Sequence, residues 1–417
     1  MGATRILFVS GSVGLGHAVR DLAIARELHA RLPGATISWL AGDVARELLA
    51  RNGQTLLPEA ERYTTGATIL ESVSQGFTLN LASPRYFIRP LRAMRLLRTF
   101  QHDLETNVAL FAAATRRQAY DLILGDETFE LVLAMGRNPG LKTAPFALIT
   151  DFIGMDAMTR DPLERGIVRL VNRAWDAMLR RAGGPTDRIL YAGEPADVPD
   201  TPLGGGGGIS RRELARRAVH FLGYVLPFDP ADLADRSALR DRLGYGREPL
   251  VICAVGSTGV GAPLLRLCAD AVPLVRARVP DARFVLVCGP RMDPAAVKAP
   301  AGARVFGYVD RLYEHFAAGD LAVVQGGGTT TLELTALRRP FIYFPLDEHF
   351  EQQLHVTYRL DRRKAGYRLK YSGTTPDMLA ETILSELAAP SPCPAIPTDG
   401  AERAAAVLGE LLQGTRT

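Results

Sequence analysis

Residues 323–334 of the chain read VVQGGGTTTLEL, and the rest of the sequence is most easily understood from them. The short, mostly apolar run 320–324 predicts a buried strand, and the good helix formers of 330–337 predict a helix that ends before Pro340. A strand, a glycine turn and a helix in this order direct free backbone N–H groups and a helix dipole at an anion. The stretch therefore predicts a phosphate-binding turn; without a ligand it would be only a tight connection from strand to helix.

The residues around this turn extend the prediction. Glycines lack side chains, so a bulky phosphate can approach their backbone closely. Thr329, Thr330 and Thr331 can cap the helix and donate hydroxyl hydrogen bonds. Glu333 lies about one turn into the predicted helix, where a carboxylate would repel phosphate at contact distance. We expect Glu333 to accept hydrogen bonds from the neighbouring hydroxyls of a sugar instead.

The composition is that of an ordinary globular protein. A chain of 417 residues is long for one core, so we expect two domains. The formal net charge of +4 is too small over this length to indicate nucleic-acid binding. The cysteines form no C-x-x-C pair, which favours buried thiols in a reducing compartment. No signal-peptide pattern begins the chain and no run of about 18 apolar residues occurs, so we expect a cytoplasmic protein.

The first part of the chain alternates predicted strands with predicted helices. This pattern implies a parallel sheet with helices on both faces, in an α/β domain. The turn after the first strand contains Gly11, Gly14 and Gly16 in the spacing G-x-x-G-x-G, which is not the dinucleotide fingerprint G-x-G-x-x-G. A nicotinamide-dependent dehydrogenase is therefore disfavoured. The predicted elements are strands 6–9 and 37–41 and helices 19–32 and 44–51.

A histidine and two carboxylates are predicted to meet at one edge of this sheet. His17 stands where the first turn becomes a helix, at the carboxyl end of the first strand, where open α/β sheets bind their ligands. Strand 121–127 ends at Asp126, and strand 144–149 runs into Asp151, at the same edge. Asp126 is therefore a candidate partner for His17. A purely structural histidine and a helix-capping carboxylate are the alternative interpretation.

Segment 84–100 has an arginine at every third or fourth position, which places these arginines on one broad face of a helix. An ordinary amphipathic helix with a solvated basic face explains the pattern. Two sharper interpretations are an interfacial helix on anionic lipid and an arginine wall that faces an acidic acceptor.

The second half repeats the strand–helix alternation after a break at residues 227–230, where we place the domain boundary. A second glycine turn, 256–261, also follows a strand, and two such turns in one sheet suit a ligand with two phosphates. The polar segment 346–353 follows the last predicted strand and is placed to bind sugar hydroxyls. The predicted strands are 250–255, 283–289, 304–309, 320–324 and 340–345, and the predicted helices between them are 263–278 and 312–318.

Two motifs of this chain resemble those of the GT-B glycosyltransferases: Gly-x-Gly-His after the first strand and Gly-Gly-x-Thr-Thr-x-x-Glu in the second half. The resemblance covers nearly the whole chain. It is closest to the UDP-glycosyltransferases of natural products and the peptidoglycan N-acetylglucosaminyltransferase. It implies two Rossmann-like domains that face each other across a cleft, 1–226 for the acceptor and 227–417 for the nucleotide sugar, with the last helix packing back on the first domain.

The resemblance also assigns donor contacts to individual residues. Gln325 departs from the family, which often has histidine there; glutamine can donate one neutral hydrogen bond to phosphate but carries no charge. Glu351 stands where the family has aspartate before glutamine. The implied contacts are Ser257, Gln325, Gly326, Gly327, Gly328, Thr329 and Thr330 at the diphosphate, Glu333 at the ribose, Tyr308 and Val309 at the base, and Glu351 and Gln352 at the donor sugar.

The implied reaction is the inverting transfer of a hexosyl group from a nucleotide sugar, expected to be UDP-linked, to an acceptor hydroxyl. His17 would be the general base, with an imidazole pKa near the ordinary ~6.5, and Asp126 would hold its tautomer. Gly14, Gly16 and Asp151 would lie on the acceptor side. Helix N-termini and hydroxyls would stabilise the leaving diphosphate, so no metal and no other cofactor is expected.

The expected partners are the nucleotide sugar and a small-molecule or lipid acceptor, with peripheral membrane contact through 84–100 as a further expectation and no nucleic acid. Two other functions remain open. A nucleotide-sugar 2-epimerase would use acidic residues such as Asp126, Glu127 and Asp151 around the sugar. A non-catalytic nucleotide-sugar-binding protein would accommodate the departure at Gln325.

Overall fold

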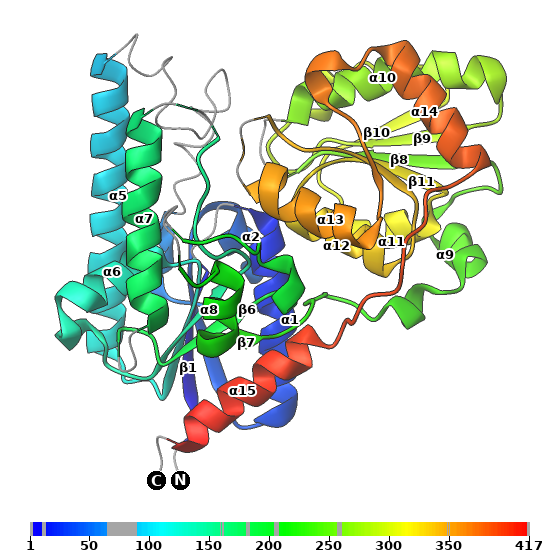
Figure 1. The fold of residues 1–417 in the computed structure, drawn as a ribbon. Helices are drawn as coiled ribbons and strands as arrows, with labels where there is room; N and C mark the ends of the chain where they lie inside the picture. Colours follow the sequence, from blue (N-terminus) through cyan, green and yellow to red (C-terminus); the bar gives the residue numbers. More distant parts are fainter. Residues whose placement is uncertain are drawn as a thin grey trace. The chain divides into compact units, whose positions relative to one another are not determined.

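The first sheet has seven parallel strands in the order β3-β2-β1-β4-β5-β6-β7 in the computed structural model of the protein (Figure 1). The structure describes residues 3–10, 14–64, 90–158, 160, 162–180, 184–203, 208–256, 261–347, 349 and 351–414, with the backbone alone for 43, 90–100, 163, 164 and 167. The strands are β1 (Arg5–Ser10), β2 (Thr36–Ala41), β3 (Thr55–Leu56), β4 (Leu122–Asp126), β5 (Phe146–Thr150), β6 (Arg188–Tyr191) and β7 (His220–Phe221).

Both faces of this sheet are buried, which explains why its strands read as continuous apolar runs. Along β1, Ile6 and Phe8 point into one core cluster while Leu7 and Val9 point into another. The first cluster lies under helices α1 (Leu15–Arg31), α2 (Asp43–Arg51) and α15 (Gly400–Gly414), and the second under α5 (Pro90–Arg117) and α6 (Phe129–Arg137). Helices α7 (Pro162–Arg180) and α8 (Arg211–Ala218) contribute to a third cluster.

The second sheet has six parallel strands in the order β10-β9-β8-β11-β12-β13. Helices α10 (Ala262–Arg278) and α14 (Pro376–Ala388) cover one face, and α11 (Leu312–Ala318), α12 (Gly328–Ala336) and α13 (Thr357–Arg363) cover the other. Helix α9 (Arg236–Leu243) precedes the sheet. The strands are β8 (Leu250–Ala254), β9 (Arg283–Val287), β10 (Ala303–Phe306), β11 (Leu321–Gln325), β12 (Phe341–Phe344) and β13 (Tyr367–Arg368).

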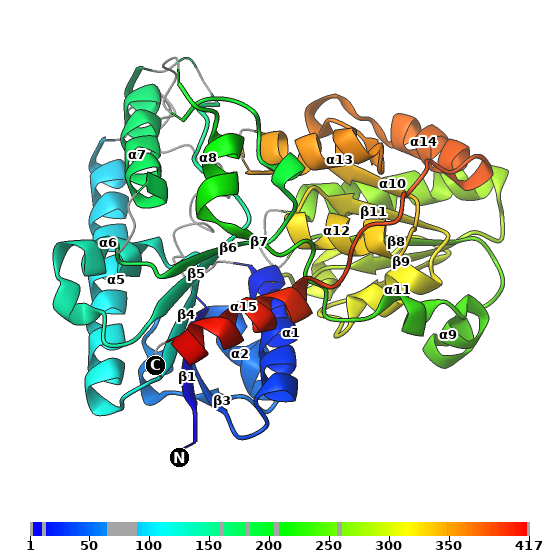
Figure 2. The same cartoon turned by 60° about the horizontal axis from the view of Figure 1, so that its bottom comes forward.

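The chain divides into two compact units, one of residues Met1–Pro227 with Pro397–Thr417 and the other of Phe228–Ile396. Each unit has one parallel sheet between layers of helices, so the prediction of two Rossmann-like α/β domains is confirmed. Helix α15 belongs to the first unit, where its residues pack with those of α1 in the same core cluster (Figure 2).

Several element boundaries differ from those predicted, and two of the differences move predicted site residues. Helix α1 begins at Leu15, four residues before the predicted start, so His17 lies inside its first turn. Strand β10 ends at Phe306 and leaves Tyr308 and Val309 in the following loop. Strand β13 was not predicted, because it has only two residues, which pair with the middle of β12 and carry no apolar pattern.

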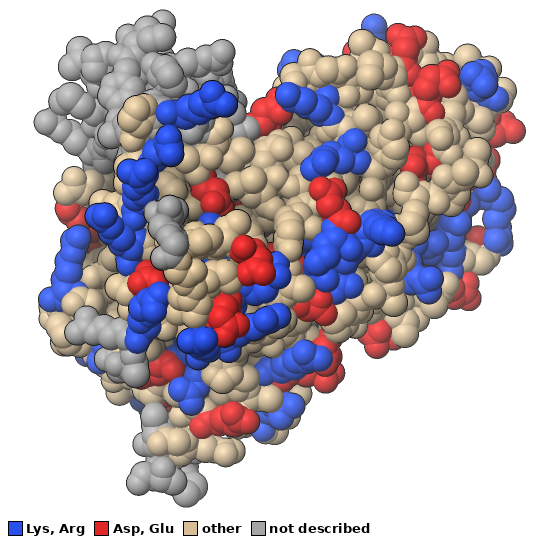
Figure 3. All heavy atoms as spheres, viewed as in Figure 1, with Lys and Arg blue, Asp and Glu red and all other residues tan. Residues whose placement is uncertain are grey.

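The cysteines and the charged side chains agree with what the composition predicts. All four cysteines are free thiols and three are buried, as predicted. No helix in the described part of the chain combines the length and apolarity needed to cross a bilayer. Figure 3 shows basic and acidic side chains interspersed over the face it draws, in keeping with the small net charge. Residues 84–89 of the arginine-rich segment lie outside the described residues and 90–100 begin α5, so its proposed contacts stay a prediction.

Candidate active site

The polar residues of the first unit meet at the carboxyl ends of three neighbouring strands. In the parallel register, Ser10 at the end of β1 pairs with Asp126 at the end of β4, and Asp126 pairs with Ile149 of β5. His17 lies in the first turn of α1, directly after β1, and its Nδ1 is 3.4 Å from Oδ1 of Asp126. Elements far apart in sequence therefore bring the predicted pair together.

A residue that the sequence did not single out, Arg20, is at the centre of this group. Its Nη2 lies 2.6 and 2.8 Å from the two carboxylate oxygens of Asp126, and its Nη1 lies 3.2 Å from Oδ2 of Asp151. The same Nη2 is 2.7 Å from Nδ1 of His17. Arg20 follows His17 by three residues, which places both on one face of α1, and this spacing was the only sequence signal for it.

The buried charges change the protonation of the carboxyl groups. Burial disfavours the charged form of Asp126, but the charge of Arg20 outweighs burial and, with His17, lowers the pKa of Asp126. Burial likewise opposes the ionisation of Asp151, and Arg20 again lowers its pKa. Asp21 differs: burial and the charge of Asp126 raise its pKa well above the ordinary value, and Ser10 Oγ donates to its Oδ2 at 2.7 Å. Arg20 is thus held by two carboxylates that remain ionised.

The expected ordinary pKa for His17 is wrong. Burial of the imidazole lowers its pKa and so does Arg20, but the charges of Glu127 and Asp126 outweigh both and raise the pKa of His17 to about 10. The sequence could not predict this value, because it depends on how closely the carboxylates approach the ring after folding.

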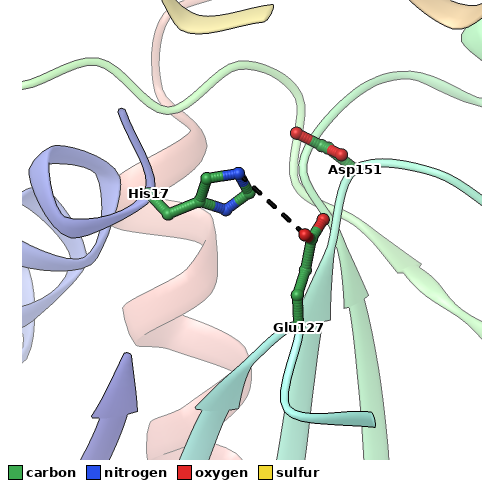
Figure 4. Close-up of side chains that lie close together, drawn as sticks. All are labelled: His17, Glu127 and Asp151. Atoms are coloured by element: carbon green, nitrogen blue, oxygen red, sulfur yellow. Dashed lines mark ion pairs between the residues drawn. The ribbon is translucent and has the colours of Figure 1, made fainter. Parts of the chain in front are cut away.

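Glu127 completes the group from the other side of the ring. Its Oε2 lies 4.0 Å from Nε2 of His17, and Figure 4 shows Glu127 and Asp151 on the same side of the imidazole. Glu127 has a left-handed backbone with φ 53°, which is unusual for a residue with a side chain and is typical of functional sites. Burial raises the pKa of Glu127 well above its ordinary value, whereas the charge of the protonated His17 lowers it, so Glu127 carries its charge as the partner of the imidazolium. Among the carboxylates, Asp126 thus lies nearest Nδ1 of the imidazole and Glu127 nearest Nε2.

Among the described residues, one group could surround a cation: His17, Glu127 and Asp151, with ligand atoms within 4.8 Å of one another. The guanidinium of Arg20 already lies 3.2 Å from Asp151 and supplies positive charge at this edge. We therefore assign no metal to the group.

In the second unit, the glycine turn at residues 326–328 connects β11 to α12. A Cβ on Gly326 would lie 2.7 Å from Cα of Pro345, so no larger residue fits there, whereas a Cβ on Gly327 would meet nothing within 4 Å. The helix begins at Gly328 with Gly327 as its N-cap, and no side chain caps it. The predicted threonine capping is therefore wrong. Thr331 instead donates its hydroxyl to the carbonyl oxygen of Gly327 at 2.9 Å.

Gln325 connects the two glycine turns of the second unit. Its Oε1 accepts a hydrogen bond of 3.0 Å from the backbone N–H of Gly256, just after the end of β8. The side-chain carbonyl is therefore already used, and the amide N–H₂ is the group left to donate to a ligand. Ser257, the second predicted phosphate contact, lies outside the described residues.

Glu333 and the segment after β12 hold the other predicted donor contacts. Glu333 is 7% exposed, and burial raises its pKa to about 8. Glu351 begins a π-helix (Glu351–Val356), a distortion frequent at functional sites, and its Oε1 lies 3.4 Å from where a Cβ on Gly328 would be. Gln352 is 9% exposed and accepts a hydrogen bond from the N–H of Leu346 at 2.9 Å, so one of the two acceptor positions of its carbonyl holds the loop.

The predicted base contacts lie in the loop after β10. Tyr308 donates its hydroxyl to Oδ1 of Asp310, in the same loop, at 3.4 Å. Val309 is partly buried against the core of the second unit. Their contact with a base stays a prediction.

Comparisons with known proteins agree with this architecture. Residues 250–404 match the model of the glycosyltransferase family 28 C-terminal domain. An uncharacterized glycosyltransferase of Methanosarcina acetivorans is 25% identical over 398 residues, covering 91% of this chain and 86% of that protein. A UDP-N-acetylglucosamine–N-acetylmuramyl-(pentapeptide) pyrophosphoryl-undecaprenol N-acetylglucosamine transferase of Carboxydothermus hydrogenoformans is 26% identical over 162 residues, 38% of this chain and 43% of that one. The solved structure of the glycotransferase of kitacinnamycin matches with a TM-score of 0.58 at 20% identity, covering 99% of this chain and 95% of that chain.

Proposed function

Because residues 250–404 match the family 28 C-terminal model and the whole chain has the GT-B fold, we propose that it is a family 28 glycosyltransferase that transfers a hexosyl group from a UDP-linked sugar to an acceptor hydroxyl with inversion. The observation that carries the proposal is the His17–Asp126 contact of 3.4 Å at the carboxyl edge of the first sheet. The first unit would bind the acceptor and the second the nucleotide sugar.

In the proposed reaction, His17 takes the acceptor proton. The acceptor O–H bond breaks and its proton moves to Nε2, while the oxygen forms a bond with the anomeric carbon of the donor. The bond from that carbon to the diphosphate breaks, and its electron pair leaves with the nucleoside diphosphate. Asp126 accepts from Nδ1–H and stabilises the imidazolium that forms.

The second unit supplies groups suited to the leaving diphosphate. The backbone N–H groups at the start of α12 and the N–H₂ of Gln325 can donate to phosphate oxygens, which makes the leaving group more stable without a metal. Glu333 is buried further along the same helix, beyond its first turn, and suits ribose hydroxyls. The Carboxydothermus relative is named for a UDP-sugar, which favours uridine as the nucleoside.

One observation favours a second function. Asp126, Glu127 and Asp151 lie around His17, and acidic residues at a sugar pocket are also what a nucleotide-sugar 2-epimerase needs. An epimerase would isomerise the nucleotide sugar with no acceptor present, so the two functions separate in one assay.

The test is an assay of several nucleotide sugars against a broad set of hydroxyl acceptors, with nucleoside diphosphate release and glycoside formation measured together. We expect transfer from UDP-sugars, equally fast in EDTA and in Mg²⁺. A reaction that needs a divalent cation would contradict the metal-independent chemistry. Donor binding without turnover or hydrolysis would instead identify a non-catalytic binding protein.

The pH dependence of the wild-type kcat should show an acidic limb whose midpoint lies far above the ordinary pKa of histidine. His17 can take a proton only when it is neutral, and its pKa is raised to about 10, so the neutral fraction is small at pH 7 and grows as the pH rises. At saturating substrates, kcat should therefore increase by about tenfold per pH unit below the limb. A limb at the ordinary value of ~6.5 would contradict the effect of Glu127 and Asp126 on His17.

A further inference from the structure

Arg20 contacts the candidate base and both carboxylates beside it, although it is only 8% exposed. We infer that Arg20 is a positioning residue that selects which nitrogen of His17 carries the imidazole proton. The inference rests on the proposed function, because it concerns the residue that would act as the general base.

Nδ1 of His17 has two polar neighbours. Nη2 of Arg20 lies 2.7 Å away and Oδ1 of Asp126 lies 3.4 Å away. A guanidinium can only donate and an ionised carboxylate can only accept, so Nδ1 cannot satisfy both. When Arg20 donates to Nδ1, the proton of the neutral ring is on Nε2, which then has no lone pair for an acceptor. When Nδ1–H donates to Asp126, Nε2 is free to act as the base.

Arg20 can change partners without leaving its place. Its Nη2 contacts both oxygens of Asp126 at 2.6 and 2.8 Å, its Nε reaches Oδ2 at 3.2 Å, and its Nη1 is held by Asp151. Loss of the contact to His17 therefore leaves the guanidinium paired with both carboxylates. A small rotation of the imidazole away from Arg20, with loss of the proton from Nε2 to water and gain of a proton at Nδ1 from water, exchanges one form of the ring for the other.

Arg20 also opposes the charge of the ring. The charged groups that act on His17 are Arg20 from α1, Asp126 and Glu127 at the end of β4, and Asp151 after β5. Asp21 of α1 interacts with Asp126 and Arg20 beside them. Glu127 and Asp126 raise the pKa of His17, whereas Arg20 lowers it. Without Arg20 the ring would hold its proton to a still higher pH, and less of the neutral base would be present at pH 7.

Two substitutions separate the hydrogen-bonding geometry of Arg20 from its charge. Arg20→Gln keeps a donor but removes the charge, and Arg20→Lys keeps the charge but removes the fork that spans His17, Asp126 and Asp151. Both proteins and the wild type are labelled with ¹⁵N-histidine, His17 is assigned with His17→Gln, and the ring is titrated by NMR while kcat is measured over the same pH range.

We expect Arg20→Gln to move the His17 midpoint and the acidic limb of kcat upward by about one pH unit, lowering kcat at pH 7 by about tenfold. In Arg20→Lys we expect a smaller shift of the midpoint but neutral-ring ¹⁵N signals that move toward the Nδ1–H form. Unchanged midpoints and unchanged ring signals in both variants would overturn the inference, even with transfer intact. If the wild type transfers no sugar, the proposed function fails, and the NMR titration still decides the role of Arg20.

Discussion

Replacement of His17 with alanine should lower the rate of sugar transfer by about 10²- to 10⁴-fold and leave donor binding unchanged. The hydroxyl of an acceptor is a poor nucleophile while it keeps its proton, and the imidazole is the group proposed to remove that proton. His17 belongs to the first unit and the glycine turn of α12 to the second, so the substitution removes no predicted donor contact. Single-turnover kinetics with saturating donor measure the chemical step, and calorimetry measures the donor affinity.

His29 on the same helix provides the matched control. It is exposed in the last turn of α1, so His29→Ala removes an imidazole without touching the polar group and should keep wild-type activity. A well-folded His17→Ala protein with full turnover would refute the catalytic role and leave a structural histidine. Any residual activity in His17→Ala should lack the acidic limb of the wild type.

Asp126→Asn should change the stability of the protein as well as its rate of transfer. The substitution weakens the support of the His17 tautomer, which predicts an intermediate rate. Asp126 is fully buried, however, and also pairs with Arg20, so the asparagine would leave a buried guanidinium with one charged partner fewer. The variant should therefore lose stability as well as rate, and its thermal unfolding has to be measured beside its kinetics.

The second large effect is expected at Glu333. Glu333→Ala should weaken binding of a nucleotide sugar by about 5- to 150-fold, because a hydrogen bond to a buried or charged group contributes about 1–3 kcal/mol. The wild type should also release protons on binding. Its carboxyl group has a pKa raised to about 8, and sugar hydroxyls donate best to the ionised form, so affinity should increase as the pH rises toward 8.

Calorimetry in buffers of different ionisation enthalpy measures this proton release. A nucleotide sugar is the better ligand, since the terminal phosphate of a free nucleotide titrates near ~6 and would add its own protons. Thr330→Val, in the first turn of the same helix, should weaken binding without changing proton release. If Glu333→Ala kept the affinity and the proton release of the wild type, the assignment of α12 to the nucleotide site would be wrong.

Glu333→Gln tests the raised pKa of Glu333 through the stability of the fold, without a ligand. A carboxyl group whose pKa is raised from 4.5 to about 8 in the folded protein stabilises the fold at low pH, and this stability is lost as the pH rises through that window. The loss is about 1.4 kcal/mol per pH unit, and glutamine cannot ionise. Glu333→Gln should therefore unfold at a higher temperature than the wild type at pH 8 and at a similar one near pH 4.5, while Glu381→Gln on the surface of α14 changes neither.

The sequence predicted those features that depend on local pattern. Continuous apolar runs identified most strands of the two buried sheets, and parallel strands necessarily end at one edge, which brought His17 and Asp126 together. Arg20 was not among the predicted site residues, because an arginine in a predicted helix normally faces solvent. Only its contacts with Asp126 and Asp151 in the folded protein show that it is buried. The raised pKa of His17 has the same origin, since it depends on a left-handed Glu127 beside the ring.

The start of α12 shows a different limit. Threonine is a common N-cap, so three threonines after the glycines predicted a capped helix. The helix instead begins at Gly328, because the chain turns at Gly326, where Pro345 leaves room for no side chain. Helix starts in glycine-rich turns are decided by neighbours distant in sequence, and a single sequence does not reveal them.

The place of α15 has a consequence for how the protein is made. Ala404, Ala405 and Leu408 are fully buried in the same cluster as Ile24 and Leu28 of α1, the helix that carries His17 and Arg20. A ribosome that has just finished residue 227 has not yet supplied this covering helix, and must first translate the whole of the second unit. At a translation rate of about 5–20 residues per second, the apolar face of α1 stays uncovered for on the order of ten seconds or more before α15 is made. Nascent chains stalled before residue 400 should therefore bind chaperones through α1 and release them once the last helix emerges.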